Sequence, residues 1–166
     1  MPITVKLMET LEEARGQAYV HYTAWQETYA GLVDQTYLDA MTLETSERYA
    51  VRAFQNGYYS TLVAKDGERV IGFAGYGPYR GDDLEDAGEV FAIYVLKAYY
   101  DQGIGRALME TALSNLAAYN RVCVWVLRGN ERAIRFYRRC GFSPDGAEKK
   151  LKLGTEVTEM RMVKDV

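Results

Sequence analysis

Two short apolar runs constrain the fold of this chain most strongly. Residues 89–96 read EVFAIYVL and residues 122–127 read VCVWVL, so nearly every position in both runs is apolar. A strand that is covered on one face alternates between apolar and polar residues, whereas a strand covered on both faces stays apolar. Both runs therefore predict buried strands of a sheet, and the first suits a central strand covered on both faces.

Local capping signals place two helices in the first third of the chain. Thr10 followed by Glu13 has the spacing of a capping box, which predicts the start of a helix. Apolar residues then recur at three- and four-residue steps, and Gly31 is expected to end this helix. A second helix is expected over Leu43–Asn56, with Gly57 closing it.

The remaining elements follow from similar patterns. The pair Asp66-Gly67 is a strong hairpin turn between two strand-like segments. Residues 143–155, before the last strand, are expected to form a loop. The further strands are expected at residues 3–7, 61–65, 69–76 and 157–163, and the further helices at residues 105–119 and 131–140. This order of elements predicts an α/β fold with a mixed sheet.

Composition narrows the class of protein. With 166 residues, 48% of them hydrophobic and 26% charged, the chain has the length and balance of one globular domain. No apolar run approaches the ~20 residues of a transmembrane helix, and the N-terminus lacks the apolar stretch of a signal peptide. We therefore expect a cytoplasmic protein with no membrane partner. Cys123 and Cys140 are too few for a disulfide framework and too isolated for a metal site.

The charges are unevenly distributed. The net charge of −3 argues against a general nucleic-acid-binding protein, so we expect no nucleic-acid partner. Residues 80–89 carry five carboxylates, whereas residues 128–139 carry five arginines and one glutamate. Such a chain could hold an anionic cofactor at one place and a cationic acceptor at another. A solvated loop and a solvated helix face would explain the same pattern, and a nucleic-acid site on the arginine-rich helix is a weaker third interpretation.

A turn with two glycines follows the first apolar run and opens the next helix. In Gln102-Gly103-Ile104-Gly105-Arg106 the glycines let the backbone turn tightly and direct N–H groups toward a ligand. The start of a helix adds a partial positive charge, which favours phosphate. The turn lacks the Lys-Ser/Thr pair of a Walker loop and the third glycine of a dinucleotide site. By its spacing alone, it could equally be a tight turn without a ligand.

A second motif lies downstream of this turn. Residues 130–142, NERAIRFYRRCGF, have the order Asn-x-x-Ala-x-x-Phe-Tyr-x-x-x-Gly-Phe. Together with residues 103–108, GIGRAL, this motif resembles the GCN5-related N-acetyltransferase (GNAT) family, strongly so over about residues 61–142. The resemblance implies an acyl-CoA N-acyltransferase fold: a mixed, largely antiparallel sheet flanked by helices, in which the two apolar strands form a splayed parallel pair. Residues 1–166 would then be a single N-acetyltransferase domain.

The resemblance also implies acetyl-CoA as the co-substrate. Its pantetheine arm would lie along the first apolar strand, with a backbone N–H near Val95 holding the oxyanion. Tyr100 stands where the family has Gln or Arg, and Asp101 adds a carboxylate near the phosphates, so backbone N–H groups must supply most of the binding. The implied cofactor-binding residues are Ile93, Tyr94, Val95, Asp101, Gln102, Gly103, Ile104, Gly105, Arg106, Asn130, Arg132, Ala133, Phe136 and Tyr137.

Acetyl transfer to an amine needs a base and an acid. The amine must be neutral to attack, and Glu89 at the start of the first apolar strand is the first candidate for the base. Tyr137 aligns with the family tyrosine that protonates the leaving thiolate. The alternatives are that Glu89 is only the last residue of the acidic segment and that Tyr137 is a core tyrosine with a satisfied hydroxyl.

The acceptor is expected to be an amine of a small molecule or of a peptide. In the family, the first two helices line the acceptor pocket, which places Trp25 and Tyr29 there, and Tyr79 could add to an aromatic site for a cationic amine. Many family members dimerise, so the resemblance is compatible with a homodimer. The alternative function is a non-catalytic acyl-CoA-binding or regulatory module on the same fold.

Overall fold

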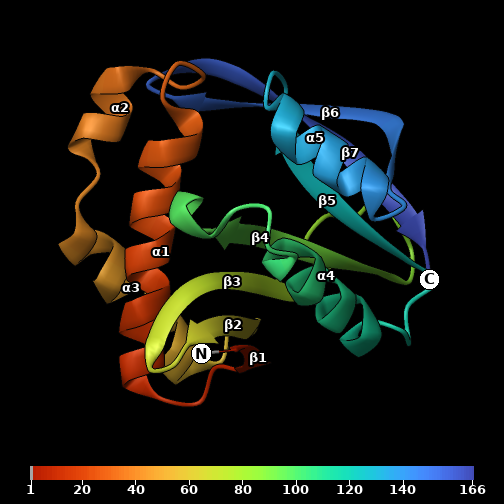
Figure 1. Cartoon of the computed structure of the whole chain (residues 1–166). Coiled ribbons are helices and arrows are strands. Elements are labelled where there is room, and N and C mark those ends of the chain that lie inside the picture. The colour runs from red at the N-terminus through yellow and green to blue at the C-terminus, as the bar shows by residue number, and fades with distance from the viewer. Residues whose placement is uncertain (1) are drawn as a thin grey trace.

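The computed structural model describes residues 2–166, which form a twisted sheet with helices on both faces (Figure 1). Over these residues the sheet has seven strands in the spatial order β1-β2-β3-β4-β5-β7-β6. The strands are β1 (Ile3–Leu7), β2 (Ser60–Asp66), β3 (Arg69–Pro78), β4 (Ala87–Val95), β5 (Arg121–Leu127), β6 (Ser143–Leu153) and β7 (Thr155–Asp165). The helices are α1 (Leu11–Tyr29), α2 (Gln35–Ala40), α3 (Leu43–Asn56), α4 (Ile104–Asn115) and α5 (Glu131–Arg139), with a short 3₁₀ helix at Lys97–Tyr99.

Strands β4 and β5 run parallel, whereas the other neighbouring strands are antiparallel. The parallel ladder is short, because it joins residues 87–89 to residues 121–123 and then stops. Within residues 2–166, β4 pairs only with β3 after Glu89, and β5 pairs only with β7 after Cys123. Figure 1 shows the two strands diverging from their paired ends. The expected mixed, largely antiparallel sheet with a splayed parallel pair is therefore confirmed.

A β-bulge in β4 accounts for this divergence. Gly75 of β3 pairs with Ala92, and the next residue, Tyr76, pairs with Val90, so Phe91 has no residue opposite it. A bulge bends its strand and increases the local twist. Because Phe91 lies just after the last parallel pair, β4 turns away from β5 there. One edge of the β4 backbone after Glu89 is consequently left without a partner strand among the described residues.

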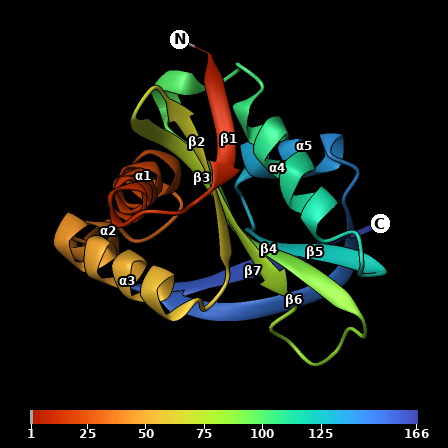
Figure 2. The same ribbon diagram turned by 90° about the horizontal axis from the view of Figure 1, so that it is seen from below.

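The helices form two layers around the sheet. Helices α1, α2 and α3 lie on one face, and α4 and α5 lie on the other (Figure 2). The strands between them are covered on both faces, and Val90, Val122 and Val124 are almost inaccessible to solvent. Val20 of α1 and Leu108 of α4 belong to the same core cluster. The core therefore holds β4 and β5 from both sides at the point where they diverge.

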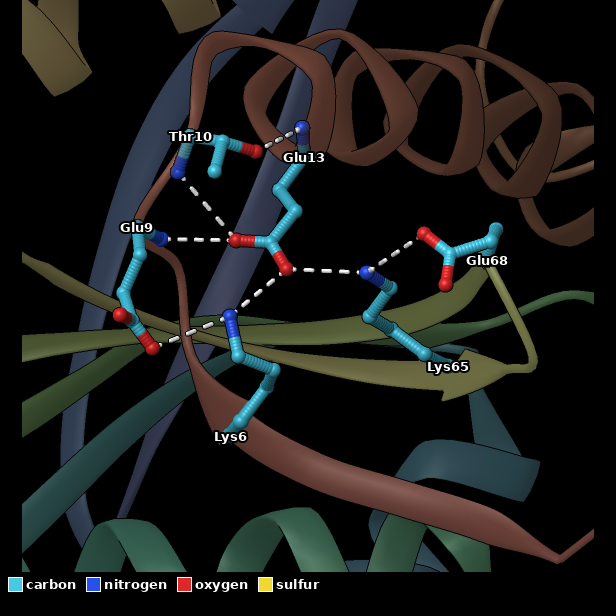
Figure 3. Close-up of polar contacts among 6 residues, drawn as sticks. All are labelled: Lys6, Glu9, Thr10, Glu13, Lys65 and Glu68. Atoms are coloured by element: carbon cyan, nitrogen blue, oxygen red, sulfur yellow. Dashed lines mark hydrogen bonds and ion pairs between the residues drawn. The ribbon is translucent and has the colours of Figure 1, made fainter.

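Glu13 joins the start of α1 to the sheet (Figure 3). Thr10 Oγ1 accepts the Glu13 N–H at 3.0 Å, and the Glu13 carboxylate accepts the N–H groups of Thr10 at 3.3 Å and Glu9 at 2.8 Å. The expected capping box is thus confirmed. The same carboxylate accepts hydrogen bonds from Lys6 Nζ at 2.7 Å and Lys65 Nζ at 3.0 Å. Burial alone would raise the pKa of Glu13, but these donors outweigh it and lower the pKa to about 2.

Several other expected elements are also confirmed. Helix α3 begins and ends at the expected residues, with Thr42 as its N-cap and Gly57 in the left-handed conformation at its end. Gly67 turns the hairpin between β2 and β3 with a φ of +61°.

Among residues 2–166, none of the helices combines the length and the apolarity needed to cross a bilayer.

Three expectations about individual elements are wrong. The expected loop at residues 143–155 contains the strand β6, which pairs with β7 at the edge of the sheet. Its residues are mostly polar because an edge strand is largely exposed, so apolar alternation does not indicate it. The sequence also fails to predict α2, a six-residue helix that Asp34 caps and that buries Leu38 alone. Helix α4 ends at Asn115 rather than at residue 119.

Candidate active site

A large cleft opens where β4 and β5 diverge. Its volume is about 1140 Å³. Residues of α1, α3, β4, β5, α5, β6 and β7 line it, together with the turn that begins α4. The site residues expected from the sequence all line this cleft except Gln102 and Glu89. Segments that are far apart in the sequence are therefore brought together much as expected.

The turn before α4 forms one end of the cleft and suits an anion. Gly103 is the N-cap of α4, with a φ of +77° that favours glycine. No side chain among residues 2–166 caps this helix, and its first turn contains no acidic residue, so its first N–H groups remain available. A Cβ on Gly105 would lie 3.3 Å from the Phe136 ring, so glycine lets α5 approach the start of α4 closely. Because Gly103 and Gly105 have no side chains, the backbone N–H groups at the start of α4 face the cleft.

Asp101 lies at this anion-binding end of the cleft, but its carboxylate is largely exposed to solvent. Its side chain is 88% exposed, and its Oδ1 lies 3.8 Å from Arg132 Nη2. The Arg132 guanidinium also lies 3.8 Å from the centre of the Tyr100 ring, within the range of a cation–π contact. The two residues that depart from the family pattern, Tyr100 and Asp101, therefore hold Arg132 beside the turn.

Tyr137 lies in the wall of the cleft on α5. Its ring is 5.6 Å from that of Phe136 and 6.0 Å from that of Phe142, between ring centres, and the residue is 7% exposed. Burial raises the pKa of its hydroxyl well above the ordinary value of 10, so the hydroxyl is protonated at neutral pH. Among residues 2–166, no side chain forms a hydrogen bond with this hydroxyl. It is therefore available as a donor to a ligand.

Glu89 is buried behind the cleft instead of facing it. The residue is 1% exposed and does not belong to the cleft lining. Its Oε1 accepts the backbone N–H of Arg80 at 3.1 Å and Arg80 Nε at 3.2 Å, and its Oε2 accepts Arg80 Nη2 at 2.7 Å. Both oxygens therefore have charged donors, and the pair ties the β3–β4 connection to β4. The sequence pattern does not indicate Arg80, which stands at the edge of an acidic segment.

An aromatic cluster lines the α1 side of the cleft. The rings of Trp25 and Tyr29 are 4.6 Å apart, and the hydroxyls of Tyr29 and Tyr94 are 2.8 Å apart. The His21 ring lies 5.7 Å from that of Trp25, and burial lowers the pKa of His21 below its ordinary value of 6.5. His21 is therefore neutral at pH 7, and the four rings of this cluster carry no formal charge.

Tyr79 also lines the cleft, but its hydroxyl belongs to a polar network around the buried Arg161. The hydroxyl donates to Asp83 Oδ1 at 2.7 Å and accepts from Arg161 Nη1 at 3.0 Å. Arg161 is 6% exposed and forms further ion pairs with Asp83 at 2.8 Å and Asp145 at 2.7 Å. This network fastens the acidic segment onto β6 and β7. Arg161 is a second structural residue that the sequence does not indicate.

Glu159 of β7 is a cleft residue that the sequence pattern does not indicate. Among residues 2–166, it and Asp101 are the acidic residues that line the cleft. Lys149 Nζ lies 3.7 Å from its Oε1, yet burial raises the pKa of Glu159 above its ordinary value of 4.5. The sequence shows only that Glu159 lies within the expected strand at residues 157–163. It does not show which strand pairs with this segment.

Comparison with known sequences agrees with this geometry. The model of the Acetyltransferase (GNAT) family matches residues 19–142 of this chain. A relative from Bacillus subtilis (strain 168), the uncharacterised N-acetyltransferase YuaI, is 32% identical over 139 residues. That alignment covers 81% of this chain and 76% of YuaI.

Solved structures share the fold. The PaiA N-acetyltransferase of Thermoplasma acidophilum, solved in complex with coenzyme A, has a TM-score of 0.75 at 21% identity, and the alignment covers 100% of both chains. YncA of Salmonella typhimurium, solved with its cofactor acetyl-CoA, has a TM-score of 0.73 at 17% identity over 99% of this chain and 94% of YncA. At these identities, the similarity establishes the fold, and the expected acyl-CoA N-acyltransferase architecture is confirmed.

Proposed function

This chain belongs to the acetyltransferase (GNAT) family, and on that basis we propose that it transfers an acetyl group from acetyl-CoA to a primary amine. The observation that carries the proposal is the cleft. It brings the uncapped start of α4, the unpaired edge of β4 and the free hydroxyl of Tyr137 to one place. These features correspond to the phosphates, the pantetheine arm and the thioester sulfur of the donor. We further propose that the whole chain acts as one domain.

The cleft residues fit acetyl-CoA in charge and in hydrogen bonding. Its phosphates are anions, and the start of α4 offers backbone N–H groups and a partial positive charge. Its pantetheine arm carries amide groups, and the unpaired edge of β4 at Ile93, Tyr94 and Val95 can bond to them as to an added strand. The structures of PaiA with coenzyme A and YncA with acetyl-CoA support the same ligand here.

Helix α5 supplies the wall that faces this edge. Asn130 is its N-cap, and its Oδ1 accepts the N–H of Ala133 at 3.3 Å. The Asn130 amide NH₂ group is consequently left to donate to a ligand. Phe136 adds an apolar surface next to the glycine turn. Asn130 thus both begins α5 and can hold the donor, as the family resemblance implies.

Residues of the chain can supply the steps of transfer. As the amine nitrogen bonds to the acetyl carbon, negative charge develops on the carbonyl oxygen, and a backbone N–H near Val95 would stabilise it. Tyr137 stays protonated at neutral pH, so its hydroxyl can donate a hydrogen to the departing sulfur. Glu89 stays a prediction for the base. Because Arg80 encloses it, Glu89 would act on the amine only through water.

The acceptor side of the cleft suits an amine of a small molecule or of a peptide. Trp25, Tyr29 and Tyr79 line the cleft and could form part of an acceptor site. The faces of aromatic rings attract ammonium groups. Most alkyl amines are protonated to ammonium ions at neutral pH. The aromatic character of this side therefore favours an amine over an anionic acceptor.

Titration with acetyl-CoA tests the proposal. Gly103 and Gly67 both have a positive φ, +77° and +61°, and a Cβ on either would meet no atom within 4 Å. Alanine therefore strains both turns by about 1–2 kcal/mol, but only the Gly103 turn lies in the cleft. We expect Gly103→Ala to bind acetyl-CoA about tenfold more weakly than the wild type, whereas Gly67→Ala binds it normally. A wild-type protein that does not bind acetyl-CoA at millimolar concentration would refute the proposal.

A further inference from the structure

Glu159 lines the same cleft as the aromatic cluster and Tyr137. In the β5–β7 ladder it is directly opposite Leu127, and both residues line the cleft. Opposite residues of an antiparallel pair present their side chains on the same face. Burial is the main cause of the raised pKa values of Tyr29 and Tyr137, and the charge of Glu159 adds to both. Glu159 therefore lines the cleft beside Leu127 of β5, and Tyr29 and Tyr137 line the same cleft.

No other carboxylate among residues 2–166 has this position. Asp101 lines the cleft at the anion-binding end, where it is largely exposed beside Arg132. Glu89 lies outside the cleft lining, with both oxygens bonded to Arg80. Glu159 is partly buried, with its side chain 24% exposed, and its separation of 3.7 Å from Lys149 is too long for a hydrogen bond. Its oxygens can therefore still accept hydrogen bonds from a ligand or a water molecule.

We infer that Glu159 is a catalytic residue that receives the proton of the acceptor amine, directly or through one water molecule. This inference rests on the proposed acetyl transfer. The amine nitrogen forms a bond to the acetyl carbon while the carbon–sulfur bond breaks. An acceptor that arrives as an ammonium ion first loses one proton to solvent by way of Glu159. The neutral nitrogen becomes positively charged as its new bond forms, which makes its N–H acidic, and this second proton passes to the Glu159 carboxylate. The sulfur takes a hydrogen from Tyr137, and exchange with solvent then restores both side chains.

The same position gives Glu159 a role in binding the acceptor. A primary alkyl amine arrives as an ammonium ion at neutral pH, and the aromatic side of the cleft offers it no formal charge. Glu159, which lines the same cleft as Trp25 and Tyr29, supplies a negative charge. The structure thus favours cationic primary amines as acceptors over amines whose neighbouring groups are anionic.

The charged groups around Glu159 define the expected pH dependence. Burial raises its pKa above 4.5, and Lys149 opposes this rise. A base with a raised pKa is charged above that pKa, so the rate should fall as the pH drops through it. The charged and titratable groups near Glu159 are Lys149 of β6, Arg80 of the β3–β4 connection, Glu89 of β4, Tyr29 of α1 and Tyr137 of α5.

The test compares Glu159→Gln with Glu156→Gln, a control on the same strand. The Glu156 side chain is 71% exposed and does not line the cleft. Release of the coenzyme A thiol is measured with a panel containing 1,4-diaminobutane, a free amino acid and a peptide with a free N-terminus. We expect Glu159→Gln to lower kcat about a hundredfold and to lose the low-pH limb of the rate profile, with acetyl-CoA affinity within about threefold of the wild type. Glu156→Gln should resemble the wild type in all three measurements.

The possible outcomes separate this inference from the proposed function. If the wild type releases thiol and Glu159→Gln does so at a similar rate, the Glu159 inference fails and the proposed function stands. If Glu159→Gln loses acetyl-CoA binding together with turnover, the residue is structural and the inference also fails. If Glu89→Gln alone abolishes turnover, Glu89 is the base. A wild-type protein that acetylates no amine of the panel overturns both proposals.

Discussion

Replacing Glu13 by glutamine measures how strongly the start of α1 is held to the sheet. Glu13 is 5% exposed, and its carboxylate accepts hydrogen bonds from Lys6 Nζ at 2.7 Å and Lys65 Nζ at 3.0 Å. Glutamine has the same shape and can still complete the capping box with Thr10. The substitution therefore removes the negative charge and leaves the two ammonium groups without their shared partner, apart from exposed Glu9 and Glu68.

The pKa of Glu13 sets an upper limit on the effect. The pKa is about 2 in the folded protein against an ordinary value of 4.5. At about 1.36 kcal/mol for each pKa unit, this difference of about 2.5 units corresponds to roughly 3.4 kcal/mol of stability. The amide oxygen of glutamine keeps part of the hydrogen bonding, so we expect a loss of about 2 kcal/mol at neutral pH. Because the folded-state pKa is the lower one, the stabilisation is complete above about pH 4.5 and is lost as the pH falls toward 2.

Urea denaturation from about pH 7 to about pH 3 gives the free energy of unfolding for the comparison. The matched control is Glu12→Gln, which removes an exposed carboxylate from the same turn and should change the free energy of unfolding by less than about 0.5 kcal/mol. The difference between the wild type and Glu13→Gln should shrink below about pH 4.5. A difference below about 0.5 kcal/mol at neutral pH, or one that does not change with pH, would refute the reasoning.

Three further substitutions have expected outcomes. Tyr137→Phe should lower kcat about a hundredfold while acetyl-CoA affinity stays within about threefold, and equal losses in both would assign Tyr137 a structural role. Gly16→Ala should destabilise the protein by about 1 kcal/mol in a urea titration, because its Cβ would lie 2.7 Å from Val70 Cγ2, and adding Val70→Ala should relieve the clash. Arg80→Gln should cost about 2 kcal/mol by leaving the buried carboxylate of Glu89 poorly paired, less than for a fully buried pair because Arg80 is 60% exposed. An unchanged urea midpoint would contradict the Arg80 prediction.

Local signals predict much of the fold because they act over a few residues. Helix α3 has the expected bounds, since its capping and its terminal glycine are encoded within one turn at each end. The two apolar runs predict buried strands because burial on both faces removes polar alternation. The edge strand β6 escapes prediction for the opposite reason: its exposed positions are polar, and the strand forms because β7 supplies the pairing.

The site is only partly predictable, and the reason is again non-local. The glycine turn and the segment 130–142 have short spacings that a sequence displays directly, and both line the cleft as expected. Short spacings in the sequence do not show which residues lie beside the carboxylates of Glu89 and Glu159. The position of Glu159 depends on the register between β5 and β7, and the enclosure of Glu89 depends on how Arg80 folds back onto β4.

The central claim is that this cleft moves an acetyl group from acetyl-CoA to a primary amine. Incubation of the wild-type protein with acetyl-CoA and a panel of primary amines, followed by mass spectrometry of the amines and detection of free thiol, tests it most directly. The structure predicts one acetylated amine for each thiol released, with little thiol release when Tyr137 is replaced by phenylalanine. Acetyl-CoA binding without any acetylated amine would contradict the claim and would indicate a non-catalytic acyl-CoA-binding module.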